Sequence, residues 1–427
     1  MKITIHRGIN QIGGCITEIQ SGDDRIMIDL GSNLPGTDGN DFTPEEIKEK
    51  TTGVQAILYT HYHGDHIGHL AHSAARQQYI GEGALEVTMI KLGKLMDASE
   101  KNLAAGRVEV AEKLDKSAEM KALSNMHTFR PNEPLSFGNI TVTPFFCSHS
   151  AFNSYMFLIE AEGKKVLHTG DFRDHGYLGK GLKKFLPAFV GQVDALITEG
   201  TMLCRGAEQV PTEAKLKIEA QRLLERKDGP HHFFALCSST DIDRLATFHK
   251  ACKDTGAWLV VDPYQKEVLD NFTKYAGKHS ALFVFDKVKT LGVEKHFFDE
   301  ISETGFIMSI RPSQISHLKK YYKCFPDAKL IYSMWNGYRD EKSPAKNQDI
   351  IDICKIFPES ALHYIHTSGH ATPQAIRNVI EMTSPRKKII IVHKDKNSDI
   401  SLLNLNAEEM DKVVAGFDDA PNNIIEI

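Results

Sequence analysis

The chain has 427 residues, a formal net charge of −5, 41% hydrophobic residues and 25% charged residues. These values are typical of a globular protein and exclude a disordered, collagen-like or coiled-coil chain. No apolar run approaches the ~20 residues that a membrane span needs, so we expect no membrane partner. The mild acidity argues against non-specific coating of nucleic acid but leaves room for a local basic groove.

The cysteines indicate a reducing compartment. There are seven of them, an odd number, scattered along the chain and without a C-x-x-C pair. This usage fits free thiols in a cytoplasmic protein better than a disulfide framework. The first six residues form a strand-like pattern and lack the apolar core of a signal peptide, which also favours a cytoplasmic location.

The first half of the chain alternates short strands with turns. Apolar and β-branched runs predict strands at 1–6, 15–19, 25–29, 54–59, 140–146, 155–160, 165–167 and 196–198. A helical periodicity covers 90–123, with Lys and Glu on its outer face.

The pattern changes near residue 205. Helical stretches at 212–226, 241–253 and 263–276 alternate with apolar runs at 232–236, 257–261 and 281–285. Further apolar runs follow at 305–310, 329–332, 362–365 and 388–392. This alternation predicts a parallel sheet with helices on both faces, and therefore an α/β protein with an inserted α/β domain near 206–355.

The densest group of chemical side chains lies in Thr60-His61-Tyr62-His63-Gly64-Asp65-His66, directly after a predicted strand. His61 and His63 are two residues apart, so an extended loop points both to one side. Asp65 and His66 then turn toward a neighbouring point. Imidazole and carboxylate clusters of this kind bind zinc and similar ions, and the arrangement suits two adjacent ions.

Other ligands are expected at the ends of later strands. His149, Asp171 and His393 each follow a predicted strand closely. A carboxylate such as Asp171 can bridge two ions, which in two-metal sites stand ~3.5–4 Å apart and activate a shared water. Cys147 and Cys204 lack a partner at ligand spacing, so we interpret both as small apolar residues.

The H-x-H-x-D-H pattern with His149, Asp171 and His393 resembles the metallo-β-lactamase superfamily, with Asp29 at the position of its first-motif aspartate. Glu199, His370 and His393 are similar to motifs A, B and C of the β-CASP branch, and RNase J-type ribonucleases are the nearest likeness. One departure is Ser309-Ile310-Arg311-Pro312-Ser313-Gln314, where RNase J has a Gly-Ser-Gln-Gly-Glu loop.

The resemblance implies an α/β fold in which a metallo-β-lactamase αββα sandwich carries an inserted α/β β-CASP domain. The sandwich would be built from 1–205 and a return segment, 356–427. The β-CASP domain would span 206–355. The oligomeric state is left open, with a homodimer as one alternative.

The resemblance also implies roles for the site residues. One divalent ion would be held by His61, His63, His149 and Asp171, and a second by Asp65, His66, Asp171 and His393. Zinc is the expected metal, with manganese as the alternative. The candidate catalytic residues are Asp65, Glu199 and His370, with His370 as a general acid oriented by Glu199.

Two segments are candidates for substrate contacts. His366, Ser368 and Gly369 form a donor-rich turn that could bind a phosphate one nucleotide away from the cleaved bond. Ser239, Thr240 and Asp241 open a predicted helix, where backbone N–H groups suit a phosphate, although a plain N-cap is an equal interpretation. Trp335 and Tyr338 could stack a base, but a core position is the preferred interpretation.

The leading hypothesis is therefore a two-metal ribonuclease that cleaves single-stranded RNA as a 5′ exonuclease, an endonuclease or both. A small-molecule metallo-hydrolase and a DNA-directed nuclease of the same fold are the alternatives. A third is a nucleic-acid-binding subunit with an inactive site, against which the complete ligand set argues.

Overall fold

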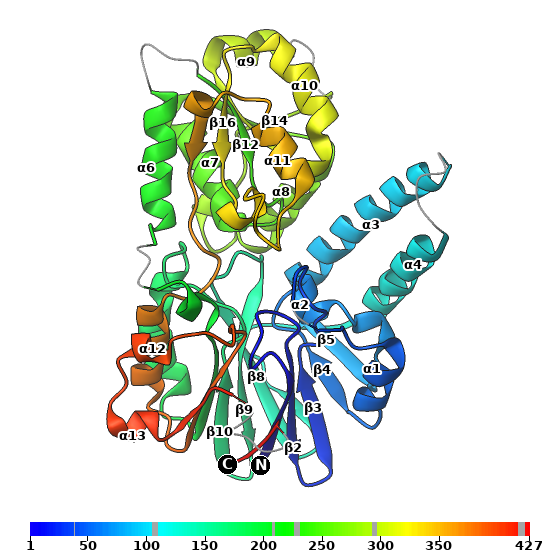
Figure 1. Ribbon diagram of the computed structural model, residues 1–427, viewed down its shortest axis with the longest axis vertical. Helices are drawn as coiled ribbons and strands as arrows, with labels where there is room; N and C mark the ends of the chain where they lie inside the picture. The colour runs from blue at the N-terminus through cyan, green and yellow to red at the C-terminus, as the bar shows by residue number, and fades with distance from the viewer. Residues whose placement is uncertain (38, 105–109, 207–209, 226–230, 293–296, 417–422) are drawn as a thin grey trace. The chain divides into compact units, whose positions relative to one another are not determined.

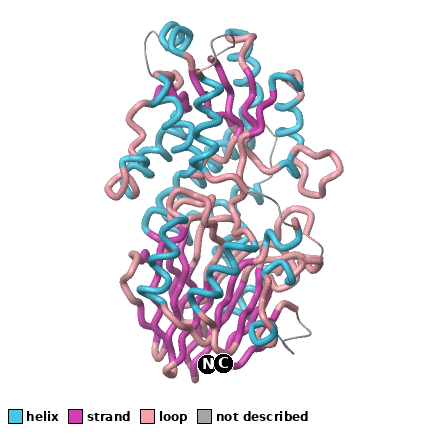
Figure 2. The backbone as a smooth tube through the Cα atoms, turned by 90° about the vertical axis from the view of Figure 1, so that its left-hand side faces the viewer, coloured by secondary structure: helices cyan, strands magenta, loops and turns pink. Residues whose placement is uncertain are grey.

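We describe the fold from a computed structural model, which covers residues 1–37, 39–104, 110–206, 210–225, 231–292, 297–416 and 423–427. The chain folds into two compact units. The first comprises Met1–Asp174, Leu178–Gln209 and Gly369–Ile427, and the second comprises His175–Tyr177 and Val210–Ser368. Strands and helices occur in both (Figures 1 and 2), so the predicted α/β class is confirmed. The assignment of the domains 1–205, 206–355 and 356–427 to known families stays a prediction.

The first unit contains two seven-stranded sheets. One has the order β20-β1-β2-β3-β4-β5-β6, with bounds β20 Ile424–Glu426, β1 Lys2–Arg7, β2 Ile16–Ser21, β3 Asp24–Ile28, β4 Ala56–Leu58, β5 Gln77–Gly81 and β6 His127–Phe129. The other has the order β19-β18-β11-β10-β9-β8-β7, with bounds β19 Val413–Val414, β18 Lys388–Val392, β11 Ala195–Glu199, β10 Lys164–His168, β9 Ser154–Ala161, β8 Ile140–Cys147 and β7 Leu135–Phe137.

Alternating apolar side chains explain why the two sheets pack face to face. Ile3 and Ile5 of β1 share one buried cluster with Phe157 and Ile159 of β9. Met156 and Leu158 of β9 belong to a second cluster on the opposite face of the same sheet, together with Leu167 of β10 and Leu196 of β11. Because successive side chains of a strand point to opposite faces, β9 is buried on both.

Helices cover the outer faces of both sheets (Figure 1). Their bounds are α1 Pro44–Thr51, α2 Gly64–Ile67, α3 Glu82–Ala104, α4 Val110–Ser124, α5 Leu182–Phe185, α12 Pro373–Thr383 and α13 Ala407–Met410. The helical stretch predicted at 90–123 is in fact two helices, α3 and α4, which lie side by side. Thr372 caps α12 by accepting the N–H of Ala375 (3.1 Å), and the helix ends at Ser384 in a left-handed conformation.

The second unit contains a six-stranded sheet in the order β14-β13-β15-β12-β16-β17. Every neighbouring pair is parallel, as predicted. The strands are β12 His232–Leu236, β13 Trp258–Val261, β14 Val288–Thr290, β15 Phe306–Ile310, β16 Lys329–Tyr332 and β17 Leu362–Tyr364. The helices are α6 Glu213–Leu224, α7 Ile242–Thr255, α8 Pro263–Tyr275, α9 Phe297–Thr304, α10 Ile315–Cys324 and α11 Gln348–Cys354.

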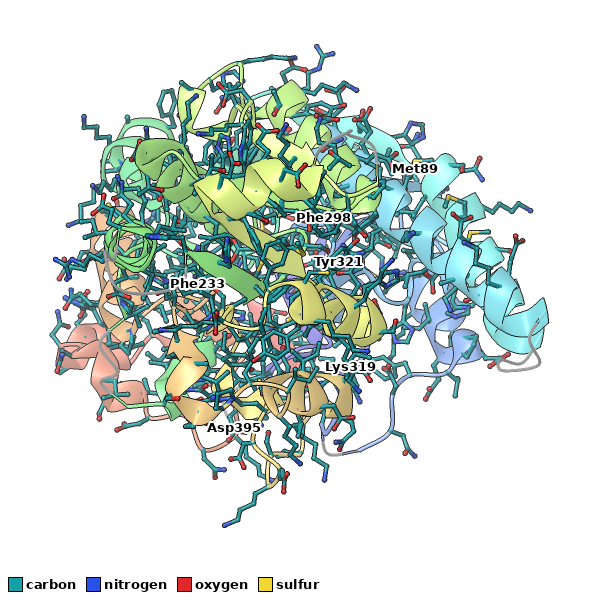
Figure 3. All side chains as sticks on the ribbon, turned by 90° about the horizontal axis from the view of Figure 1, so that it is seen from above. Met89, Phe233, Phe298, Lys319, Tyr321 and Asp395 are labelled. Carbon is teal, nitrogen blue, oxygen red and sulfur yellow. The ribbon has the colours of Figure 1, made fainter. Side chains whose placement is uncertain are left out.

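Aromatic side chains of neighbouring segments contact one another in this unit. Phe298 of α9 lies against Tyr321 of α10, with ring centroids 6.0 Å apart (Figure 3). The predicted strand at 281–285 is wrong, because Ala281–Phe283 is a 3-10 turn and the strand is β14. Its two aromatic residues, Phe283 and Phe285, are buried nonetheless, and Phe285 packs on Phe272 (6.2 Å between centroids). A buried turn and a buried strand have the same apolar composition.

A buried ion pair joins α6 and α7 within the second unit. Nε and Nη2 of Arg244 donate to the carboxylate of Glu213 at 3.3 and 2.9 Å, and the Thr247 hydroxyl donates to the same carboxylate at 2.8 Å. Glu213 and Arg244 are both almost fully buried. Breaking such a pair leaves a desolvated charge without its partner.

We expect Glu213→Ala to lower the free energy of unfolding of this unit by ~3–5 kcal/mol. Both tryptophans, Trp258 and Trp335, belong to the second unit, so tryptophan fluorescence during urea unfolding follows it specifically. Asp270→Ala is the control, because Asp270 pairs with Lys266 on the surface and such pairs contribute ~1 kcal/mol or less. Equal stability of the two variants would contradict the prediction.

Candidate metal centre

The His-rich loop lies where the carboxyl ends of several strands meet. β3 and β4 run parallel to each other in one sheet, and β10, β11 and β18 run parallel in the other. Parallel neighbours end at the same edge of a sheet, so the residues that follow them lie close together. The segments after these strands carry the predicted ligands: His61, His63, Asp65 and His66 after β4, Asp171 after β10, and His393 after β18.

Three histidines form the first group of ligand atoms. Nδ1 of His63 lies 3.1 Å from Nε2 of His61 and 3.2 Å from Nε2 of His149. Burial lowers the pKa of His61 and His149 well below the ordinary value and lowers the pKa of His63 to about 4. Three neutral rings with converging nitrogens are the form in which imidazole binds a cation.

A second group contains Asp65, His66 and His393. Nε2 of His393 donates to Oδ2 of Asp65 at 3.0 Å, and Nε2 of His66 lies 3.9 Å from the same oxygen. Among the side chains that the structure describes, none forms a hydrogen bond of good geometry with Nε2 of His66. Burial disfavours a charged His66, but the carboxylates of Asp171 and Asp29 outweigh it and raise its pKa well above the ordinary value. These carboxylates favour positive charge at this point, either as a proton on the ring or as a cation that replaces it.

Asp171 links the two groups. Its Oδ2 lies 3.2 Å from Nε2 of His66 and 3.6 Å from Nε2 of His393. The same oxygen lies 3.9 Å from Nε2 of both His61 and His149. Burial alone would raise the pKa of this carboxyl, but His393 and His66 hold it well below its usual range. The His/Asp groups could bind metal ions, and Asp171 is placed where one carboxylate can serve both.

Hydrogen bonds behind the ligands fix their ring orientation. Asp29, at a positive φ of 62°, accepts the N–H and the hydroxyl of Thr60 (2.7 and 2.8 Å) and Nδ1–H of His66 (2.8 Å). Nδ1 of His149 donates to the carbonyl oxygen of Gly369 at 2.7 Å. In both histidines the bonded Nδ1 leaves Nε2 for the centre, the usual arrangement of metal-binding histidines.

Glu199 and His370 lie beside Asp171. Nδ1 of His370 donates to Oε2 of Glu199 at 3.0 Å, while Oε1 of Glu199 accepts the backbone N–H of Phe172 (2.9 Å) and of Ala371 (3.2 Å). Glu199 is buried, whereas the His370 side chain is 22% exposed. The arrangement holds a partly exposed imidazole on a fixed carboxylate, and the catalytic role of either residue stays a prediction.

Sequence reasoning missed Thr201, which connects His370 and His393. The Thr201 hydroxyl donates to the carbonyl oxygen of His393 (3.1 Å), so it accepts from Nδ1 of His393 (2.7 Å) and lies 3.2 Å from Nδ1 of His370. Its only sequence signal was its place two residues after Glu199, at a strand end. Cys15 was also missed, although its Sγ lies near His66 and His393.

The residues predicted to contact the substrate are divided between the two units. Gly369 belongs to the first unit, where its carbonyl holds His149, but Ser239, Thr240, Asp241, His366 and Ser368 belong to the second. Asp241 caps α7 by accepting the N–H of Arg244 at 3.2 Å, so a carboxylate already occupies that helix start. Phosphate binding at either segment stays a prediction.

The core position preferred for Trp335 and Tyr338 is wrong, because they are 37% and 36% exposed.

The chain is similar over part of its length to a protein-family model and to several curated ribonucleases. The model of the family "Anti-Pycsar protein Apyc1" matches residues 17–185. Ribonuclease J of Helicobacter pylori is 28% identical over 184 residues, 41% of this chain and 24% of the relative. Ribonuclease J 1 of Streptococcus pyogenes is 27% identical over 267 residues, 60% of this chain and 43% of the relative. The Neurospora crassa endoribonuclease ysh-1 is 24% identical over 199 residues, 45% of this chain and 23% of the relative.

These matches make the chain a distant relative of Ribonuclease J proteins, of which it spans less than half the length. A crystal structure of a protein of unknown function from Enterococcus faecalis V583 has the same fold, with a TM-score of 0.65, 16% identity and 95% of both chains covered. None of the helices in the described part of the chain has the length and hydropathy of a membrane span.

Proposed function

We propose that the chain is a metal-dependent ribonuclease that hydrolyses phosphodiester bonds of single-stranded RNA, acting as a 5′ exonuclease, an endonuclease or both. The observation that carries the proposal is the position of Asp171 Oδ2 between the two ligand groups. The ribonuclease relatives supply the substrate class. In this proposal the first unit corresponds to a metallo-β-lactamase domain and the second to a β-CASP domain.

The ligand groups divide naturally between two divalent ions, which we propose to be zinc. His61, His63 and His149 would hold one ion and Asp65, His66 and His393 the other, with Asp171 shared. When bound, such ions supply an activated water and neutralise the charge that develops on a phosphoryl group. The histidines contribute neutral nitrogen ligands, and Asp29 and Gly369 keep two of their rings in the ligating orientation.

His370 is the proposed source of the proton for the departing oxygen. Its Nδ1–H is held by Glu199, so Nε2 is the ring nitrogen that remains for proton transfer. Glu199 is itself fixed by the backbone of Phe172 and Ala371, which keeps the ring from rotating. We expect this ring to act on the leaving group, because it lies beside the ligand groups and remains partly exposed.

The test is a cleavage assay on end-labelled single-stranded RNA and matched DNA, each with a 5′ monophosphate or a 5′ hydroxyl. We expect RNA cleavage with Zn²⁺ or Mn²⁺ that stops on chelation and is absent in Asp65→Ala. Mononucleotides released from 5′-monophosphate RNA would establish an exonuclease and support phosphate binding by His366, Ser368 and Gly369. Internal fragments would establish an endonuclease.

Two outcomes of the same assay would contradict the proposal. Cleavage of DNA alone would make the chain a DNA-directed nuclease. No cleavage of either polymer by protein with measured bound metal would favour a small-molecule metallo-hydrolase or a binding subunit.

A further inference from the structure

Cys15 is held against the histidine loop by its backbone. Gly13 and Gly14, both with positive φ (82° and 64°), turn the chain just before it. The N–H of Cys15 then donates to the carbonyl oxygen of Asp65 at 2.9 Å, and its own carbonyl accepts the N–H of Gly31 at 3.0 Å. A Cβ on Gly31 would lie 1.7 Å from the Asp65 oxygen, so only glycine permits this contact.

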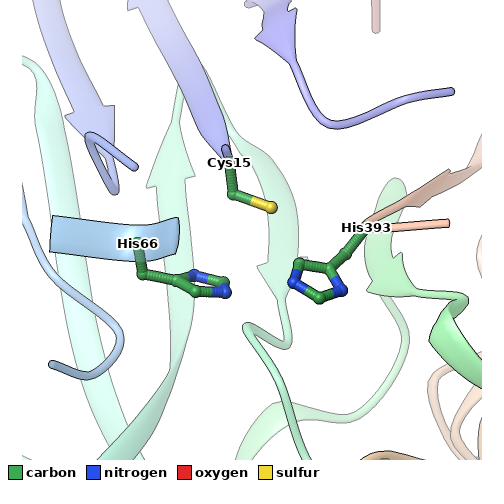
Figure 4. Close-up of side chains that lie close together, drawn as sticks. All are labelled: Cys15, His66 and His393. Carbon is green, nitrogen blue, oxygen red and sulfur yellow. The ribbon is translucent and has the colours of Figure 1, made fainter. Parts of the chain in front are cut away.

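The Cys15 side chain points to the second ligand group. Its Sγ and one ring nitrogen each of His66 and His393 all lie within 4.8 Å of one another, and Figure 4 shows the three side chains converging from separate segments. Cys15 is only 6% exposed. Around a tetrahedral ion, ligand atoms at ~2.1–2.3 Å stand roughly 3.4–3.6 Å apart, so binding would draw these atoms closer together than the 4.8 Å that bounds them here.

An independent observation also points to a ligand at this place. His66 is 1% exposed, and its Nε2 forms no hydrogen bond of good geometry with any described side chain. Nδ1 of the same ring is bonded to Asp29, so the ring cannot turn to satisfy Nε2 elsewhere. Oδ2 of Asp171 lies 3.2 Å from this nitrogen but outside hydrogen-bond geometry, and a cation bound between the two would satisfy both.

We propose that the Cys15 thiolate is a further ligand of the ion held by Asp65, His66 and His393, and that this sulfur makes the position favour zinc over manganese. The inference rests on the metal-binding part of the proposed function. Thiolate is a soft ligand that suits zinc, whereas manganese prefers oxygen donors. Binding forms one metal–sulfur bond and releases the thiol proton to solvent, with no change of oxidation state.

The test uses the full chain, freed of metal by chelation and reloaded with Co²⁺. A cobalt–thiolate bond gives an intense near-ultraviolet charge-transfer band, and nitrogen and oxygen ligands do not. We expect the band in the wild type and its loss in Cys15→Ala. The matched control is Cys147→Ala, which should keep the band, because Cys147 is equally buried but its Sγ donates to the backbone oxygen of Asp171. Circular dichroism verifies the fold of both variants.

X-ray absorption on the zinc-loaded wild type needs no variant, so a misfolded Cys15→Ala protein would not stop the test. We expect a sulfur scatterer at ~2.3 Å together with nitrogen and oxygen at ~2.0–2.1 Å. A shell of nitrogen and oxygen only, or a cobalt band that survives in folded Cys15→Ala, would overturn the inference.

Failure of the ribonuclease proposal gives a different result. Protein that shows the band but cleaves no RNA keeps Cys15 as a ligand and loses the proposed substrate. Protein that binds no cobalt and no zinc, by direct metal analysis, contradicts both.

Discussion

Asp171→Ala is expected to lower the rate of RNA cleavage by at least ~10³-fold. Oδ2 of Asp171 lies within 4 Å of ligand nitrogens in both groups, so its removal affects both proposed ions at once. A loss of ~4 kcal/mol of transition-state stabilisation corresponds to this factor, and each 1.36 kcal/mol is tenfold. The measurement is kcat/KM on 5′-monophosphate RNA, with bound metal determined in parallel.

The controls separate this effect from unfolding. Asp171→Asn keeps the shape of the side chain but removes its charge, and we expect it to be nearly as inactive. Asp270→Ala removes a carboxylate from the surface of the second unit and should leave the rate unchanged. A folded Asp171→Ala protein with full metal content and wild-type kcat/KM would show that this carboxylate does not serve the centre.

The ligands that could be predicted from the residues alone are those that lie close together in the sequence. His61, His63, Asp65 and His66 lie within six residues, so one loop after one strand is enough to gather them. His393 could be added because it follows an apolar run, whereas Glu199 was added only through its resemblance to motif A of the β-CASP branch. The structure supplies the reason they meet, since β11 pairs in parallel with β18 and places Glu199 opposite Val392.

Thr201 and Cys15 were beyond sequence reasoning because their partners depend on tertiary register. Thr201 reaches His393 across a strand pairing of distant segments. Cys15 reaches the loop through its backbone contact with Asp65, which the glycine at position 31 permits. Neither residue stands at ligand spacing in the sequence, and a lone threonine or cysteine carries no periodic signal.

The strands of the second unit were predicted correctly where an apolar run also had the length of a strand. The runs at 232–236 and 329–332 are β12 and β16. The strand predicted at 281–285 is wrong because it rested on apolar composition alone. Ser280 instead starts a turn by accepting the N–H of Leu282. Burial alone does not distinguish the two conformations.

His370→Ala is expected to slow RNA cleavage by ~10²–10⁴-fold, the usual contribution of a general acid, while leaving the bound metal unchanged. A ring nitrogen of His370 lies within 4.8 Å of ligand atoms of Asp171, Glu199 and His393, but its Nδ1 is directed at Glu199, and we assign the ring to neither ion. The cleavage rate should therefore fall in this variant without a loss of bound metal, whereas both should fall in Asp171→Ala. Wild-type cleavage by His370→Ala would show that the general acid is assigned wrongly.

The leaving group distinguishes proton transfer from simple positioning. A p-nitrophenyl phosphodiester releases p-nitrophenolate, a stable anion that needs no proton, so an acid catalyst contributes little to its cleavage. We expect His370→Ala to be close to wild type on this ester and strongly impaired on RNA, whereas Asp171→Ala should be impaired on both. Equal impairment of His370→Ala on the two substrates would instead mean that the ring, held by Glu199 and Thr201, only orders the neighbouring ligands.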